Sequence, residues 1–97
     1  MFEVFYTGKA KDQLIRLKSN SGLAKRYSAV KKAIGYLSQN PKYAGLNTHE
    51  FKMLKGPKGE KVFTAYAEQS TPAAYRIFWH YGPEKDQITI IAVTSHP

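Results

Sequence analysis

The sequence predicts a two-layer α+β domain: an N-terminal strand, an antiparallel helical hairpin, then a three-strand antiparallel meander. Three observations support this fold. The chain begins with an alternating apolar segment, two helical repeats follow with a short polar break between them, and the last third holds alternating runs rich in aromatic and β-branched residues. With 97 residues, the chain has room for one domain, residues 1–97, and not for two.

The first predicted elements are a short strand and a short helix. Phe2, Val4 and Tyr6 alternate along the chain, as residues on one face of a strand do. Thr7 follows and is expected to cap a helix over residues 9–18, in which apolar residues recur every three or four positions. Polar residues 19–22 then end this helix.

The second helix is predicted by a continuous apolar stripe at 4-3-4-3 spacing: Leu23, Tyr27, Val30, Ile34 and Leu37. Ser21 is the expected N-cap, and Asn40-Pro41 ends the helix because the residue before proline avoids the α region. Lys25 and Lys32 point away from the stripe, and Arg26 and Lys31 flank it. The helix therefore buries one face and presents cations elsewhere.

The remaining chain is predicted to be mostly strand. Residues 49–55 are expected to form a short strand or a turn, and strands are expected over residues 62–69, 74–81 and 88–95. The last of these is nearly continuously apolar, which predicts a central place in the sheet. Alternation places Tyr75, Ile77, Trp79 and Tyr81 on one face, with Trp79 in the core, and Arg76, Phe78 and His80 on the other.

Charge is unevenly distributed along the chain. Fifteen Lys and Arg residues face seven Asp and Glu residues, a formal net charge of +8. Residues 9–61 contain thirteen of the basic residues and three of the acids, so this segment alone carries +10. Such asymmetry favours an anionic partner, either nucleic acid or an acidic protein, although a highly soluble surface is the simpler interpretation.

Several classes of function are disfavoured by the composition. There is no cysteine, so no disulfide scaffold, thiol nucleophile or thiolate metal site is available. Phosphate-binding glycine motifs are absent, and the three histidines lack the spacing of a zinc site, so neither a cofactor nor a metal is expected. No apolar run is long enough for a membrane helix and no signal peptide is visible, which predicts a cytoplasmic protein without membrane contact.

Four segments resemble the RelE/ParE superfamily of toxins from type II toxin–antitoxin systems. They are the end of the basic hairpin at Leu37–Pro41, the approach segment His49–Gly56, the tyrosine-arginine strand Ala74–Trp79, and the last strand Ile88–His96. The resemblance covers nearly the whole chain. It implies a toxin held inactive by a small acidic antitoxin, and most directly a ribosome-associated, metal-independent mRNA endoribonuclease that inhibits translation. Two alternatives stay open: a non-enzymatic, ParE-like inhibitor of DNA gyrase, and a basic RNA-binding or interaction module that has lost activity.

The resemblance also implies roles for particular residues. Arg76 is expected to contact the scissile phosphate, because guanidinium is always charged and can bond two phosphate oxygens. Its structural alternative is an arginine on the solvent face of the sheet, paired with Glu68 or another acid. Lys52 and Lys55 are expected to stabilise charge or act as a base, and His96 and His80 to transfer protons. His49 is interpreted as a loop residue. The expected nucleic-acid-binding residues are Lys25, Arg26, Lys31, Lys32 and Lys61.

One departure from the family pattern affects the chemistry. Several nucleases of this family continue past the last strand into a helix or tail that supplies a catalytic residue, commonly a tyrosine, whereas this sequence ends at Pro97. His96 or His80 would then have to replace that residue, or the protein is not a nuclease of this type.

Overall fold

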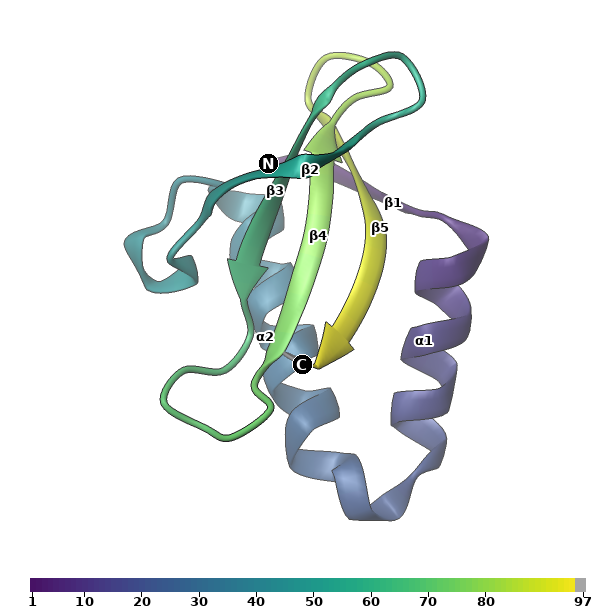
Figure 1. Cartoon of the computed structure of the whole chain (residues 1–97), viewed down its shortest axis with the longest axis vertical. Coiled ribbons are helices and arrows are strands. Elements are labelled where there is room, and N and C mark those ends of the chain that lie inside the picture. Colours follow the sequence, from purple (N-terminus) through teal and green to yellow (C-terminus); the bar gives the residue numbers. More distant parts are fainter. Residues whose placement is uncertain (96–97) are drawn as a thin grey trace.

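The computed structural model describes residues 1–95, and a five-stranded sheet with two α-helices forms its framework (Figure 1). The strands are β1 (Glu3–Tyr6), β2 (His49–Lys55), β3 (Lys61–Tyr66), β4 (Tyr75–Tyr81) and β5 (Gln87–Ser95). The helices are α1 (Gly8–Ser19) and α2 (Ala24–Gln39), and short 3₁₀ turns occur at Ser21–Leu23 and Ala44–Leu46. This order confirms the predicted α+β fold, and residues 49–55 prove to be a full strand. No helix among the described residues is long and apolar enough to cross a bilayer.

The strands lie in the order β1-β5-β4-β3-β2. β2, β3, β4 and β5 pair antiparallel in succession, whereas β1 pairs parallel with β5. β5 is therefore flanked on both sides, as its apolar sequence predicts, although β4 holds the middle position. β1 is thus an edge strand of the sheet, and the helical hairpin connects it to the other strands.

The main core lies between the sheet and the two helices. Trp79 is 1% exposed, as predicted, and packs with the buried faces of α1, α2 and the inner strands. The α2 stripe contributes as expected, because Val30 and Leu37 are buried and Leu23, Tyr27 and Ile34 pack against the core. Figure 1 shows α2 behind the sheet and α1 beside β5, so the opposite face of the sheet carries no helix. We call that side the open face.

The helix ends agree only partly with prediction. Thr7 caps α1 as expected, since its hydroxyl accepts a hydrogen bond from the Ala10 N–H at 3.1 Å. The prediction of Ser21 as the N-cap of α2 is wrong, because a 3₁₀ turn precedes that helix and Leu23 occupies its cap position without a side-chain bond. Asn20 caps the 3₁₀ turn instead, accepting from the Gly22 N–H at 3.0 Å. α2 ends at Gln39, before Asn40-Pro41, as predicted.

A second, smaller cluster lies on the open face. Val62, Thr64 and His80 are buried there, outside the main core, by the alternation of β3 and β4. Phe51 of β2 packs edge-on against Phe78 of β4, with ring centroids 5.0 Å apart. Phe51 of β2 thus covers Phe78 on the open face, and this aromatic pair does not extend over Arg76.

Candidate nucleic-acid site on the open face

Arg76 occupies the open face of β4, and its nearest partner is an aromatic ring. Its register partners are Tyr66 on β3 and Thr94 on β5. The Arg76 guanidinium carbon lies 4.9 Å from the centroid of the Tyr66 ring, a cation–π contact that holds the side chain against the sheet. The predicted structural alternative does not occur, because Glu68 pairs with Arg26.

The guanidinium of Arg76 also lacks hydrogen-bond and ion-pair partners among the described residues. Its Nε atom is buried and has no hydrogen-bond partner among residues 1–95, and no carboxylate of these residues lies within 4.0 Å of its guanidinium. The residue itself is half-buried. A charged donor without an acceptor lowers the stability of the fold. A guanidinium left without an anionic partner is therefore a candidate for binding an anion.

His49 belongs to the same cluster. It lies in β2 opposite Thr64, and its ring centroid is 5.7 Å from that of Tyr66. Its Nδ1 atom lies 3.1 Å from the Asn47 carbonyl oxygen. The sequence interpretation of His49 as a loop residue is therefore wrong. The prediction of a strand or a turn over residues 49–55 does include His49, but no sequence signal identifies Tyr66 as its neighbour.

His80 shares the open face with Arg76 but lies in a different environment. It is 3% exposed, and its Nδ1 atom lies 2.7 Å from the Tyr81 carbonyl oxygen. Four strand positions separate it from Arg76, about 13 Å along the strand. Charge attraction from His80 is a minor contribution to the lowered pKa of Glu60, which arises first from hydrogen bonds donated by the backbone N–H groups of Glu60 and Lys58. His80 is thus enclosed near the β2–β3 turn.

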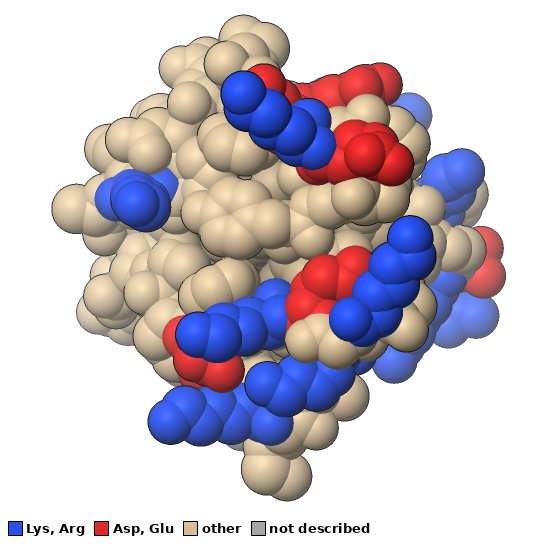
Figure 2. Space-filling model, turned by 90° about the horizontal axis from the view of Figure 1, so that it is seen from above, with Lys and Arg blue, Asp and Glu red and all other residues tan. Residues whose placement is uncertain are grey.

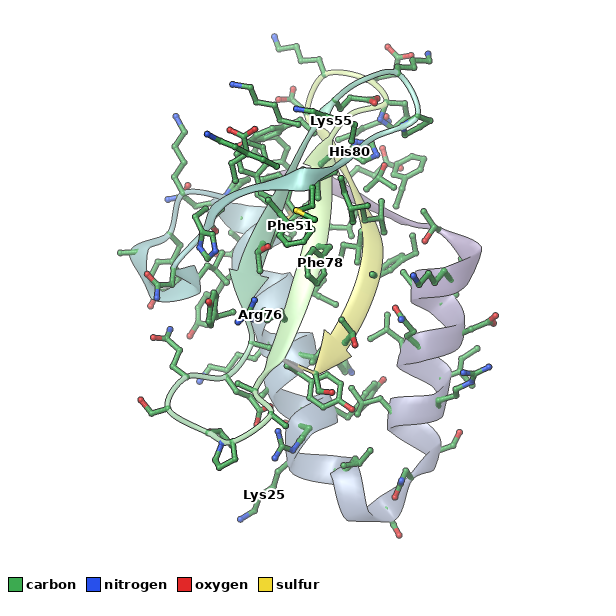
Figure 3. All side chains as sticks on the ribbon, in the orientation of Figure 1. Lys25, Phe51, Lys55, Arg76, Phe78 and His80 are labelled. Carbon is green, nitrogen blue, oxygen red and sulfur yellow. The ribbon has the colours of Figure 1, made fainter. Side chains whose placement is uncertain are left out.

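Lys55, one of the predicted lysines of the approach segment, also lies away from Arg76. Lys55 is paired in register with Lys61, five positions along β3 from Tyr66, or about 17 Å. The Lys55 Nζ atom lies 3.9 Å from a carboxylate oxygen of Glu50. Lys52 is exposed on β2. Figure 3 shows Lys55 and His80 at the upper end of the sheet and Arg76 towards the lower end, with Phe51 and Phe78 between them.

The cations of the helical hairpin lie in the other layer. Residues 8–39 contain eight Lys and Arg residues and one acid, Asp12. Lys25, Lys31 and Lys32 are exposed, and Figure 3 shows Lys25 at the lower end of α2, away from Arg76. The predicted binding residues therefore form two surfaces and not one.

Arg26 has structural partners in the folded chain. Its guanidinium donates to Glu68 at 3.1 Å and to the carbonyl oxygens of Ala73 and Pro72 at 3.0 and 3.2 Å. It also lies over the Tyr75 ring, 5.8 Å from its centroid. These contacts join α2 to the β3–β4 loop.

Charges are mixed at the end of the molecule that carries the β2–β3 and β4–β5 turns. Figure 2, which views this end from above, shows acidic side chains interspersed among basic ones. The acids of these turns are Glu60, Glu84 and Asp86. Such mixing weakens the field for a polyanion at this end. Among the described residues, no three His, Asp or Glu side chains gather as metal ligands. His96 lies outside the described residues.

No protein-family profile matches this sequence, and no curated protein matches it either. Solved structures do match. A YoeB/ParE toxin from Agrobacterium tumefaciens matches with a TM-score of 0.71 and 11% identity, over 99% of this chain and 100% of that chain. A YoeB dimer from Staphylococcus aureus matches with a TM-score of 0.64 and 11% identity, over 99% and 98% of the two chains.

An archaeal RelE–RelB complex from Pyrococcus horikoshii matches with a TM-score of 0.65 and 14% identity, over 97% of this chain and 93% of that chain. Identities this low establish a common architecture and leave the activity to be argued from the residues present. The chain therefore has the RelE/ParE-like toxin fold over nearly its whole length.

Proposed function

We propose that this protein is the toxin of a type II toxin–antitoxin system and cleaves mRNA on the ribosome without a metal ion. The reaction is attack of an RNA 2′-oxygen on the adjacent phosphorus, with departure of the 5′-oxygen. Negative charge spreads over the phosphoryl oxygens in the transition state, so the protein must supply a positioned cation. The fold shared with YoeB, ParE and RelE toxins supports the toxin assignment.

The observation that carries the proposal is the state of Arg76. The Arg76 guanidinium lies over the Tyr66 ring and has no carboxylate partner within 4.0 Å in the described part of the chain, so its terminal N–H groups are available to phosphate oxygens. The cation–π contact holds the guanidinium in place, and a guanidinium can donate two hydrogen bonds to one phosphate. Because the group is already partly desolvated and held in place, it needs little reorganisation during the reaction.

The lysines of β2 and β3 take a different role in this proposal. Lys55 and Lys61 lie about 17 Å along the sheet from the register position of Arg76. At that distance they do not act in the chemistry of the cleaved bond, and the phosphates within their reach are flanking ones, at an end where neighbouring acids weaken the attraction. Their contribution is to affinity, and it weakens with salt.

The proposed antitoxin is a small acidic protein that docks on the helical layer. An apolar depression on α1, lined by Tyr6, Leu14, Ile15 and Lys11, has a cavity volume of about 260 Å³, and Ile15 is 61% exposed. The hairpin around it carries eight cations and one acid. An amphipathic acidic helix complements both features. The RelE neighbour was solved as a complex with RelB, which is consistent with such a partner.

Induced expression in bacteria, with protein and DNA synthesis pulse-labelled in parallel, tests the function. The proposal predicts that protein synthesis falls first, that Arg76→Gln abolishes this effect, and that Arg16→Gln does not. Arg16 is an exposed cation on α1, so this control removes the same charge from the other layer. An early fall in DNA synthesis would instead support gyrase inhibition, and normal growth with both syntheses intact would contradict a toxin role.

A further inference from the structure

We propose that His49 is the general base of the Arg76 site and takes the proton of the attacking 2′-hydroxyl. This inference rests on the proposed function. The 2′-oxygen forms the new bond to phosphorus, its proton passes to Nε2 of His49, and the bond from phosphorus to the 5′-oxygen breaks. The leaving 5′-oxygen takes a proton from solvent. The products are a 2′,3′-cyclic phosphate and a 5′-hydroxyl end, and imidazolium returns its proton to water.

The sheet register places His49 on the same face as Arg76, with Tyr66 of the intervening strand β3 in contact with both side chains. His49 pairs with Thr64, and Tyr66 lies two positions further along β3, so all three lie on the open face. The imidazole centroid is 5.7 Å from the Tyr66 ring centroid, and the Arg76 guanidinium carbon is 4.9 Å from the same ring. One phenol ring therefore contacts both the proposed base and the proposed phosphate ligand.

A backbone carbonyl fixes the tautomer of His49. Nδ1 lies 3.1 Å from the Asn47 carbonyl oxygen, and a carbonyl can only accept, so Nδ1 carries the hydrogen. Neutral imidazole then has its lone pair on Nε2, which is the form that a general base requires. Asn47 is in the left-handed region, with φ of 51° and ψ of 40°, so the turn that presents this carbonyl has a specific backbone geometry.

Exposure separates His49 from the other described histidine of the open face. His49 is exposed on the edge strand β2, whereas His80 is 3% exposed and bonded to the Tyr81 carbonyl oxygen. The first imidazole is therefore accessible to a bound RNA and the second is not.

The charged and titratable groups around His49 are few. On its own strand, Glu50 follows it and is paired with Lys55 at 3.9 Å. From β3 it meets the Tyr66 phenol ring and is paired in register with Thr64. From β4, Arg76 contacts that same phenol ring. The Thr64 hydroxyl is buried without a partner in the described part of the chain. No carboxylate lies within 4.0 Å of the imidazole among these residues.

The experiment is single-turnover cleavage of a defined mRNA on purified ribosomes, from about pH 5.5 to pH 8.5. Wild type, His49→Gln and the control Met53→Gln are compared, because Met53 is a highly exposed residue of the same strand, 84% accessible. We expect wild type and the control to cleave faster as pH rises, as the imidazole loses its proton. His49→Gln should cleave about 10²–10⁴-fold more slowly near pH 7.5 and lose that pH dependence.

Two further measurements distinguish a base from other roles. Binding of an RNA with a 2′-O-methyl group at the cleavage position should be the same for wild type and His49→Gln. An RNA with sulfur in place of the leaving 5′-oxygen should not rescue His49→Gln, because a better leaving group replaces a general acid and not a base.

Each contrary result overturns a defined claim. If wild type cleaves and His49→Gln retains its rate and pH profile, His49 is not the base, although the proposed function stands. If His49→Gln loses RNA affinity but keeps the pH profile, or is rescued by the sulfur leaving group, the general-base role is refuted. If wild type produces no cyclic phosphate end under any condition, the proposed nuclease function fails, and this inference with it.

Discussion

Replacement of Arg26 by methionine should destabilise the fold substantially, although a sequence-based interpretation places this residue on a nucleic-acid-binding surface. The substitution keeps an apolar stem and removes every donor. Three hydrogen bonds are lost, to Glu68 and to the carbonyl oxygens of Pro72 and Ala73. Each of them joins α2 to the β3–β4 loop.

The size of the stability loss follows from how deeply Arg26 and Glu68 are buried. The side chains of Arg26 and Glu68 are 26% and 14% exposed, so water replaces the lost partner only in part. Glu68 retains one donor, the Tyr75 N–H at 3.1 Å. A hydrogen bond to a charged group contributes about 1.5–3 kcal/mol. Because these groups are partly exposed, the three hydrogen bonds of Arg26 together contribute much less than three times that amount. We expect the free energy of unfolding to fall by about 2–3 kcal/mol, or roughly 8–24 °C in Tm.

Urea unfolding followed by circular dichroism measures this change. The matched control is Lys25→Met, at the neighbouring exposed position, which should stay within about 0.5 kcal/mol of wild type. A double-mutant cycle with Glu68→Gln isolates the direct interaction and should give a coupling of about 1–2 kcal/mol. If Arg26→Met is as stable as Lys25→Met, the guanidinium does not anchor the loop and the reasoning is refuted.

Three other predictions concern the fold. Trp79→Ala should lower the free energy of unfolding by about 3–5 kcal/mol, because the indole is 1% exposed in the main core; a loss below about 1 kcal/mol in urea unfolding would contradict this packing. Thr7→Ala should cost about 1 kcal/mol by leaving the Ala10 N–H without its cap, and Thr7→Ser should restore most of it in the same assay. Hydrogen bonds from backbone N–H groups lower the pKa of Glu60, so its contribution is present above its ordinary pKa and is lost as pH falls. The stability difference between wild type and Glu60→Gln should therefore be largest near neutrality and shrink as pH falls through the lowered folded-state pKa of Glu60, and a pH-independent difference would contradict it.

Local patterns predict the elements of this fold well. The 4-3-4-3 stripe predicts α2 and its buried side because a helix must cover one apolar face. The Asn40-Pro41 pair predicts where α2 ends. The cap of α2 is not predicted, because the Asn20 side chain bonds to the Gly22 N–H and begins a 3₁₀ turn ahead of the helix.

The sequence does not indicate which strands and side chains that are far apart in the chain lie side by side. Glu3 of β1 lies opposite Gln87 of β5, and nothing in either strand indicates a parallel partner so distant in the chain. The same limit applies to the site. Arg76 is predicted as a phosphate ligand, but Tyr66 and His49 come to it only through the register of three strands. Arg26 is taken for a surface cation because its partner Glu68 lies 42 positions away.

Cleavage by Arg76→Gln tests the central claim most directly, provided that its stability is measured on the same preparation. The Arg76 Nε atom has no partner among residues 1–95, so the substitution should change the free energy of unfolding by no more than about 1 kcal/mol, the scale of its contact with Tyr66. We predict that single-turnover cleavage of ribosome-bound mRNA falls by about 10²–10³-fold, while Arg16→Gln cleaves like wild type. Cleavage at the wild-type rate by a folded Arg76→Gln protein would contradict the assignment of the open face as the active site.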